Sequence, residues 1–439
     1  MENKKSTDTI LDVYDRPALG QWFGLSFQHL FAMFGSTVIV PILVGINPAI
    51  ALLSSGLGTL AHMSVTRFKV PIYMSSSFAY IGVMQLLMKN GGMPAIAQGA
   101  LTGGLVYFVV ALLVHFIGNG WINKVLPPIV VGPVVMVIGL SLASTAVTDS
   151  QIGADGKYSL VYLAIALVTV FAIVAFNIFG KGFLGVIPIL LGIVTGYVFA
   201  LVLGSILHQD LVNLSAVSTS SWLGLPPVSF PLFTSHFQFY PSAILMVAPI
   251  AFVTMTEHFG HIMVINSLTH RNYFKDPGLD KTLSGDGFAQ IIAGILGAPP
   301  VTSYGENIGV MALTKIHSIY VIAGAAVFAI VLSFIGKVTA IIHSIPMPVI
   351  GGASIALFGV IAASGLKILV DEKVNFDIKR NLLIASVVLV SGIGGLVINV
   401  SEFQISSVAL ATILGILLNV ILPKDEEKEP EGFEPEKVE

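Results

Sequence analysis

The sequence predicts an all-α polytopic membrane protein with fourteen transmembrane segments, and its composition, apolar segments and basic residues all favour this fold class. Of the 439 residues, 55% are hydrophobic and 10% are charged, whereas soluble domains carry roughly 25% charged residues. This composition excludes a cytosolic enzyme. A net charge of −3 offers no basic surface, so no nucleic-acid partner is expected. Cysteine is absent, which excludes disulfides and thiolate chemistry.

The apolar segments set the number of crossings of the lipid bilayer. A hydrocarbon core of about 30 Å requires roughly 20 apolar residues in each helix. The first segment follows a polar stretch that contains Asp8, Asp12 and Asp15, so we do not expect it to be a cleavable signal peptide. Charges, prolines and turn residues divide the chain into fourteen segments, at residues 22–44, 47–66, 70–88, 94–118, 127–147, 158–180, 183–206, 240–266, 282–297, 300–315, 318–342, 345–363, 380–398 and 401–422.

The basic residues predict the orientation. With a cytoplasmic N-terminus, 18 of the 21 Lys and Arg residues fall on the cytoplasmic side, and only Lys89, Lys157 and Lys337 fall outside. We therefore expect a multi-pass protein of the cell (cytoplasmic) membrane with both termini cytoplasmic. The predicted divisions are a cytoplasmic tail at 1–18, seven segments within 19–206, an extracellular connection at 207–239, seven segments within 240–422 and an acidic, disordered tail at 423–439.

The two sets of seven segments suggest an internal repeat. Because seven is odd, two such repeats have opposite orientations in the membrane and form an inverted pair. A shift of 220 residues aligns segment five with segment twelve, so that Pro128 meets Pro348 and Gly132 meets Gly352. Composition alone is the alternative explanation for some of these matches.

Segments three and ten are short, and both begin with proline followed by small or hydroxyl residues: VPIYMSSSF at 70–78 and PPVTSYGE at 299–306. Proline removes a backbone donor and disfavours helix at the preceding residue. We expect each segment to enter the membrane as an extended stretch and to become helical near the midplane, with free N–H groups at the start of each half-helix. Paired broken segments of this kind indicate the substrate site of a transporter; packed hairpins are the structural alternative.

Of the acidic residues, only Glu257 and Glu306 are expected deep in the membrane, shielded from water, while Asp286 and Glu402 are expected at segment ends within reach of water. A buried intramembrane carboxylate costs several kcal/mol, so it indicates function by default. Pairing that holds helices together is the alternative. His261 lies four residues after Glu257, on the same helix face, and is placed to hydrogen-bond the Glu257 carboxyl.

Two further histidines, His258 and His29, are candidates near the site. His258 points about 100° away from Glu257, and the spacing of these residues argues against a zinc site, which uses two histidines four residues apart with the glutamate between them. His29 in segment one aligns with Glu257 under a shift of 228 residues. It is either a second-shell partner of the site or a packing residue.

The charge of the candidate site predicts which molecules it binds. No Lys or Arg lies deep in the membrane, so a bare anion is repelled, whereas a neutral molecule with N–H donors and C=O acceptors suits a carboxylate and free helix amides. Tyr304 and Phe78 offer flat apolar surface to a ring. No Walker A motif occurs, and we expect no cofactor, with the proton as the coupling ion. The competing classes are an anion exchanger or channel and an intramembrane enzyme, for which no nucleophile–base pair is found.

Four motifs carry a family resemblance: QHLFAMFG at 28–35, SSFA at 76–79, EHFGH at 257–261 and GENIGVMALTK at 305–315. The last resembles the signature of the nucleobase–ascorbate transporter family (nucleobase:cation symporter-2), an acid or amide followed by Asn-x-Gly and, five residues on, Thr. The resemblance covers nearly the whole chain from Pro17 to segment fourteen. Glutamate in the first position points to uracil, whereas glutamine there would suggest xanthine, urate or ascorbate.

The resemblance implies a fold of 7+7 inverted repeats. A core domain of segments 1–4 and 8–11 moves against a gate domain of segments 5–7 and 12–14, and the resemblance also implies a homodimer. It implies proton-coupled uracil uptake by alternating access, with a xanthine, purine or broader pyrimidine transporter as the alternative. The residues that it implies are Glu257 and Glu306 on the pyrimidine, His261 supporting Glu257 in proton coupling, Tyr304 on the ring, and the backbones of Phe78 and Gly305 as donors to substrate oxygens. His29, Asn307, Ser77 and Phe358 are the candidates for support around these residues, and Phe358 stands where the family would have a tyrosine.

Overall fold

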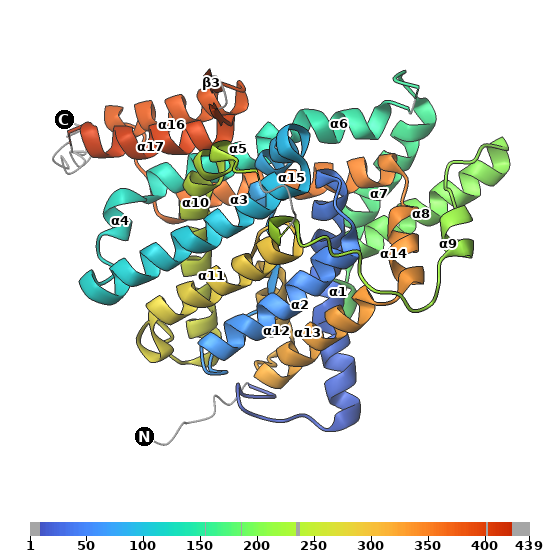
Figure 1. Ribbon diagram of the computed structural model, residues 1–439, viewed down its shortest axis with the longest axis horizontal. Helices are drawn as coiled ribbons and strands as arrows, with labels where there is room; N and C mark the ends of the chain where they lie inside the picture. Colours follow the sequence, from blue (N-terminus) through green and yellow to red (C-terminus); the bar gives the residue numbers. More distant parts are fainter. Residues whose placement is uncertain (1–8, 154, 186, 234–237, 401–402, 424–439) are drawn as a thin grey trace, which may run out of the picture.

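The computed structural model of this chain is mostly helical and describes residues 9–153, 155–185, 187–233, 238–400 and 403–423 (Figure 1). The acidic tail predicted at 423–439 falls almost wholly outside the described residues, as does Glu402. The α-helices are α1 Leu19–Val44, α2 Pro48–Val65, α3 Ile81–Ile117, α4 Ile122–Val125, α5 Pro128–Ser141, α6 Ala143–Gln151, α7 Leu160–Phe179, α8 Pro188–Leu207, α9 Ser215–Thr219, α10 Pro241–Thr269, α11 Leu279–Leu296, α12 Gly305–Thr314, α13 Ile319–Ser333, α14 Gly336–His343, α15 Met347–Asp371, α16 Lys379–Ile393 and α17 Ser407–Ile421.

Short elements complete the chain. The 3-10 helices are η1 Phe78–Tyr80, η2 Gly182–Gly185 and η3 Pro231–Phe233, and a π-helical turn, η4, covers Phe274–Gly278. The strands are β1 Met74–Ser76, β2 Val301–Ser303, β3 Ile398–Val400 and β4 Phe403–Ile405.

The described residues contain eight helices that are long and apolar enough to cross a membrane, namely α1, α2, α3, α5 with α6, α7, α8, α10 and α15. A ninth candidate is the pair α13 and α14, which bend by 82° at the break between them. The chain is therefore a multi-pass membrane protein. The remaining predicted segments correspond to shorter helices, so the count of fourteen crossings stays a prediction.

Two predicted segments are wrong in detail. The sequence places residues 394–398 in segment thirteen and residues 401–406 in segment fourteen, but α16 ends at Ile393 and the chain continues into the antiparallel hairpin of β3 and β4. Gly395 takes φ +75°, a conformation that suits glycine and ends the helix. The predicted break between segments three and four corresponds to the kink of α3, where two helices meet and Gly92 leaves the helical conformation with φ +61°.

The extended stretches predicted in segments three and ten are confirmed. β1 and β2 pair antiparallel in a two-stranded sheet, with Met74 opposite Ser303 and Ser76 opposite Val301, and all six residues are buried. Helix α12 begins two residues after β2, and η1 leads from β1 into α3. Because the strands run in opposite directions, the two following helices leave the sheet from opposite ends.

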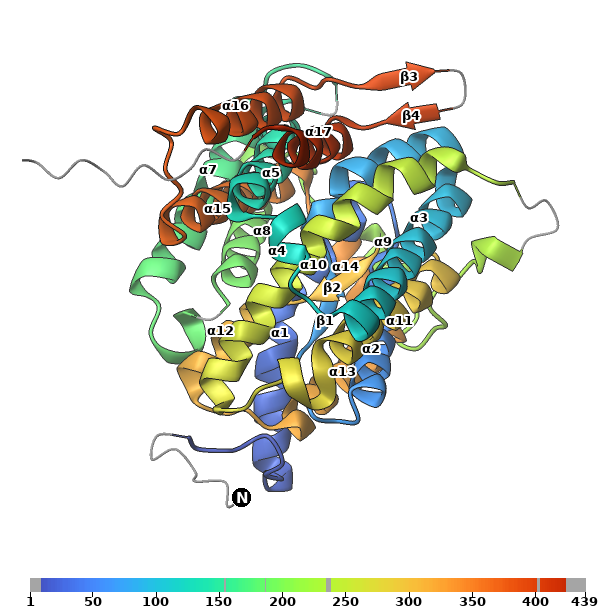
Figure 2. The same ribbon diagram turned by 90° about the vertical axis from the view of Figure 1, so that its left-hand side faces the viewer.

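The helices gather into two groups, which Figure 2 shows from the side. Helices α1, α2, α3, α11 and α13 contact one another around the β1–β2 sheet. Helices α5, α7, α8, α15, α16 and α17 contact one another in a second group, and α10 contacts members of both.

Polar contacts between distant connections agree with the predicted sidedness. The guanidinium of Arg271 lies 2.9 Å from the carboxylate of Asp12. The sequence predicts both residues on the cytoplasmic side, because both stretches carry basic residues. The amide of Asn90 donates to the side-chain oxygen of Gln404 at 2.6 Å, on the opposite predicted side.

Candidate functional site

The start of α12 gathers the residues of the family signature beside the buried sheet. The backbone N–H of Tyr304 donates to the carbonyl of Tyr73 at 3.0 Å, which ties the end of β2 to the chain before β1. The carboxylate of Glu306, which is half-buried, accepts hydrogen bonds from its own backbone N–H and from the phenol of Tyr304. Glu306 is therefore held as an acceptor at the N-terminus of a helix, where the backbone dipoles favour negative charge.

Asn307, the next residue of α12, is buried and bound to α1. Its Nδ2 donates to the carbonyl oxygen of His29 at 3.0 Å and lies 3.2 Å from His29 Nδ1. His29 is itself buried. His29 thus contacts Asn307, the residue that directly follows Glu306. It supports the site through Asn307.

The imidazole of His261 is turned toward β2 and α12. Its Nδ1 lies 2.9 Å from the hydroxyl of Ser303, and a Cβ atom placed on Gly305 would lie 3.0 Å from its Nε2. Among the described hydrogen bonds there is none between His261 and Glu257, although their spacing permits it. The ring instead spans from Ser303 to Gly305, because α10 packs directly on β2 and α12.

Glu257 lies on α10, the helix that contacts both β2 and α12. Its carboxylate interacts electrostatically with that of Glu306, so the two acids share one region. Glu257 is exposed, however, and Glu306 is half-buried. The Glu257 side chain is therefore the more accessible of the two.

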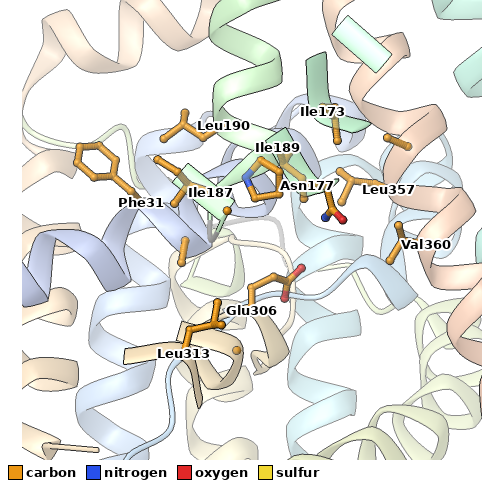
Figure 3. Close-up of a pocket in the computed structure, with 15 residues that line it drawn as sticks. Phe31, Ile173, Asn177, Ile187, Ile189, Leu190, Glu306, Leu313, Leu357 and Val360 are labelled. Atoms are coloured by element: carbon orange, nitrogen blue, oxygen red, sulfur yellow. The ribbon is translucent and has the colours of Figure 1, made fainter. Parts of the chain in front are cut away.

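A cavity of about 250 Å³ opens beside Glu306 (Figure 3). Its walls come from α1, α7, α8, α12 and α15, and they are apolar except for two side chains, Glu306 and Asn177 of α7. Figure 3 shows these two projecting into the cavity from opposite walls. The volume is below the roughly 300–1,000 Å³ of sites for drug-sized ligands, which suits a small molecule.

Of the predicted site residues, Glu306 is the one among the residues that line this cavity, and the others lie around it. The N–H of Ser77 donates to the carbonyl of Pro300 at 3.0 Å and so joins the two broken segments. Phe78 is half-buried at the start of η1. Phe358 is 3% exposed and packs in the hydrophobic core, while its neighbours Leu357 and Val360 line the cavity.

The expected position of Asp286, at a segment end within reach of water, is wrong. Asp286 is fully buried in the middle of α11, not exposed at a segment end. Its Oδ2 lies 3.0 Å from His258 Nδ1, and its Oδ1 lies 3.4 Å from His62 Nε2. The predicted segment nine begins at residue 282, which places Asp286 near its end. Helix α11 begins earlier, at Leu279, and it packs against α2 and α3.

A signal for this buried acid exists in the chain, because Asp286 stands between two glycines within an apolar stretch. Glycines allow neighbouring helices to approach closely, so an acid between them is covered by its neighbours. Within the part of the chain that the structure describes, no three His, Asp or Glu side chains are grouped as ligands for a metal ion.

Comparison with known proteins places the chain among transporters. A family model described as the Permease family matches residues 20–401. The chain is 50% identical to the uracil permease of Bacillus caldolyticus, over 94% of this chain and 95% of that protein. It is 46% identical to the uracil permease of Bacillus subtilis (strain 168), over 97% and 98% of the two chains, and 39% identical to that of Escherichia coli (strain K12), over 94% of each.

Solved structures resemble the fold at low sequence identity. The transmembrane domain of a cyanobacterium bicarbonate transporter matches with a TM-score of 0.63 and 15% identity, over 93% of this chain and 99% of that one. The murine Solute Carrier 26 family member A9 anion transporter, in its inward-facing state, matches with a TM-score of 0.66 and 11% identity, over 95% and 69% of the two chains. These similarities concern the fold alone.

Proposed function

The chain belongs to the Permease family, the family that its signature resembles, and on this premise we propose that it carries uracil across the cell membrane together with a proton. The chain is a transporter and not an enzyme. Relatives that are 39–50% identical over nearly the whole chain are uracil permeases. The observation that carries the proposal is the Glu306 carboxylate, held at the start of α12 and open to a small cavity.

The chemistry of uracil matches the groups around Glu306. Uracil presents N–H donors and C=O acceptors on a flat ring. In this proposal the Glu306 carboxylate accepts from a ring N–H, and the backbone N–H groups of Phe78 and Gly305 donate to the ring carbonyls. Tyr304 and Phe78 contact the faces of the ring.

Proton coupling is proposed for Glu257, with His261 beside it. Because the carboxylates of Glu257 and Glu306 interact and carry like charge, a proton on Glu257 removes one of two neighbouring negative charges. Protonation of Glu257 then favours uracil binding at Glu306, and uracil favours protonation in return. In this proposal Glu257, whose side chain is the more accessible of the two, is the group that takes up and releases the proton.

The finer architecture also belongs to the proposal. A core domain of segments 1–4 and 8–11 and a gate domain of segments 5–7 and 12–14 are supported by the two groups of contacting helices. The cavity beside Glu306 lies between α1 of one group, with α12 that contacts it, and α7, α8 and α15 of the other, where alternating access would open and close it. Inverted repeats, fourteen crossings, a homodimer in the bilayer, cytoplasmic termini and the absence of a cofactor complete the proposal.

Uptake into proteoliposomes tests the function. We expect an inward proton gradient to drive accumulation of labelled uracil above its equilibrium level. Unlabelled uracil should compete fully, and a series of thymine, 5-fluorouracil, xanthine and hypoxanthine should rank the pyrimidines above the purines. Competition by xanthine equal to that by uracil would instead favour a purine transporter on the same fold.

The substitution Glu257→Gln isolates the coupling step. The amide mimics the protonated carboxyl, so we expect uracil binding and uracil–uracil exchange to persist while gradient-driven accumulation is lost. Asp377→Asn, in an exposed connection, serves as the matched control and should accumulate uracil normally. Accumulation that survives in Glu257→Gln would show that the coupling proton travels elsewhere.

A further inference from the structure

A row of polar contacts joins the buried Asp286 to the candidate site. His258 Nδ1 lies 3.0 Å from Asp286 Oδ2 and 3.1 Å from Ser303 Oγ. Ser303 Oγ lies 2.9 Å from His261 Nδ1. Asp286, His258 and Ser303 are fully or almost fully buried, so water does not interrupt the row. These four residues, which we call the Asp286 relay, come from α11, α10 and β2.

The carboxylate determines which nitrogen of His258 carries a hydrogen. A buried carboxylate is stable only with a compensating positive charge or hydrogen-bond donor. The negative charge of the Asp286 carboxylate, whose Oδ2 lies 3.0 Å from His258 Nδ1, favours a hydrogen on this nitrogen over a lone pair. The hydrogen therefore belongs on Nδ1, and a hydrogen on Nε2 would find no partner among the described groups around it.

Other polar groups near Asp286 do not take over this role. Tyr80 and Tyr107 interact with Asp286 electrostatically. Their phenols, however, hydrogen-bond to the Thr254 hydroxyl at 3.1 and 3.0 Å. His62 lies 3.4 Å from the other carboxylate oxygen and supports the negative charge from the opposite side. The imidazoles, which are more basic than a carboxylate, are therefore the groups that bear the hydrogens next to Asp286.

Ser303 links the position of the hydrogen on His258 to the position of the hydrogen on His261. A serine hydroxyl has one hydrogen to donate and lone pairs with which to accept. The one hydrogen on His258 Nδ1 is donated to Ser303 Oγ at 3.1 Å, and the Asp286 carboxylate acts on it through its charge. The hydroxyl hydrogen of Ser303 is therefore free to point at His261 Nδ1. His261 Nδ1 then accepts, and the hydrogen of the neutral ring stands on Nε2.

We propose that Asp286 is a positioning residue that sets the tautomer of His261 through His258 and Ser303. The Nε2–H of His261 is thereby directed toward Gly305, the first residue of α12, as a donor beside Glu306. A donor there suits a ring carbonyl, while Glu306 accepts from the adjacent N–H. This last step rests on the proposed function, whereas the tautomer itself does not.

Nitrogen NMR of the histidine side chains tests the tautomer without any substrate. Protonated and unprotonated imidazole nitrogens have separate ¹⁵N signals, and the spectrum of His261→Gln identifies the signals of His261 among the 10 histidines. In the unmodified protein we expect an unprotonated Nδ1 and a protonated Nε2 at His261. The opposite pattern, with the hydrogen on Nδ1, would overturn the proposal.

Substitutions then test the relay. In Ser303→Ala, His261 loses its donor and should become a mixture of tautomers, whereas Ser303→Thr keeps the hydroxyl and should keep the Nε2–H form. Asp286→Ala should change the His261 signals in the same way as Ser303→Ala, and Asp286→Asn, which retains an acceptor oxygen, should change them less. Ser54→Ala removes another buried hydroxyl, one without a hydrogen-bond partner, and serves as the control. Unchanged His261 signals in both Ser303→Ala and Asp286→Ala would refute the relay.

Uracil affinity provides the second measurement. We expect Ser303→Ala to weaken uracil binding by about tenfold, the effect of one lost hydrogen bond of roughly 1.4 kcal/mol, and Ser303→Thr to restore it. If the unmodified protein bound no uracil but showed the expected tautomer, the proposed function would fail and the relay would stand. If uracil binding were normal and the tautomer reversed, the relay would fail alone.

Discussion

Asn307 of α12 holds His29 of α1 by two contacts across 278 residues of sequence: its Nδ2 lies 3.0 Å from the backbone oxygen and 3.2 Å from Nδ1 of His29. Both side chains are buried. Since Glu306 directly precedes Asn307, this pair determines where the carboxylate lies relative to α1. Asn307, which follows Glu306 in the signature, therefore positions Glu306.

Replacing Asn307 by Ala should lower thermal stability and weaken uracil binding together. The substitution leaves the buried imidazole of His29 without its donor from Asn307 and removes the additional hydrogen bond to the His29 carbonyl, at a cost of about 1–3 kcal/mol. Melting in detergent and equilibrium binding measure the two effects. In a double-mutant cycle with His29→Ala, we expect a coupling energy of about 1 kcal/mol for the side-chain contact; strictly additive effects would contradict it.

Replacing Glu306 by Gln should abolish uracil binding, because an amide N–H stands where an acceptor is required. Burying an unmatched donor costs about 1–3 kcal/mol, in addition to the lost charged hydrogen bond. Tyr304→Phe, which removes only the phenol that supports the carboxylate, should weaken binding by about tenfold. A dissociation constant for Glu306→Gln within about threefold of the unmodified protein would exclude the assigned role.

Replacing Asn177 by Leu should raise the KM for uracil uptake on the order of tenfold while leaving the fold intact. Asn177 and Glu306 are the two polar side chains of the cavity, so the substitution removes the hydrogen-bonding group of one wall. The concentration dependence of uptake measures the change. Asn177→Gln keeps an amide and should retain most of the affinity, and equal KM values for both variants would show that the amide is not used.

Replacing Gly104 by Ala should destabilise the protein by about 1–3 kcal/mol, because α3 and α11 approach too closely for a side chain. A Cβ atom on Gly104 would lie 2.7 Å from the backbone oxygen of Gly287. Gly359→Ala is the matched control within α15, since nothing lies within 4 Å of its Cβ position. There the substitution should be neutral or should stabilise the helix by up to about 1 kcal/mol. Melting temperatures in detergent compare the two variants.

The sequence by itself determined the features that depend on local composition. Long apolar stretches identified a membrane protein, because each must reach across about 30 Å of hydrocarbon. Proline at residues 71, 299 and 300 identified the two extended stretches, because it constrains its own backbone and that of the residue before it. The signature around Glu306 identified the family, because its residues are neighbours in the chain and can be recognised from the sequence alone.

The tertiary structure alone decided which distant groups meet. His62, His258 and Asp286 lie on α2, α10 and α11, and no spacing in the sequence brings them together. The pairing of β1 with β2, the exposure of Glu257 and the approach of Asn177 to the cavity beside Glu306 likewise depend on how separate helices pack. Hydropathy and backbone preference act over a few residues, whereas burial and charge pairing are set by neighbours that lie hundreds of residues away along the chain.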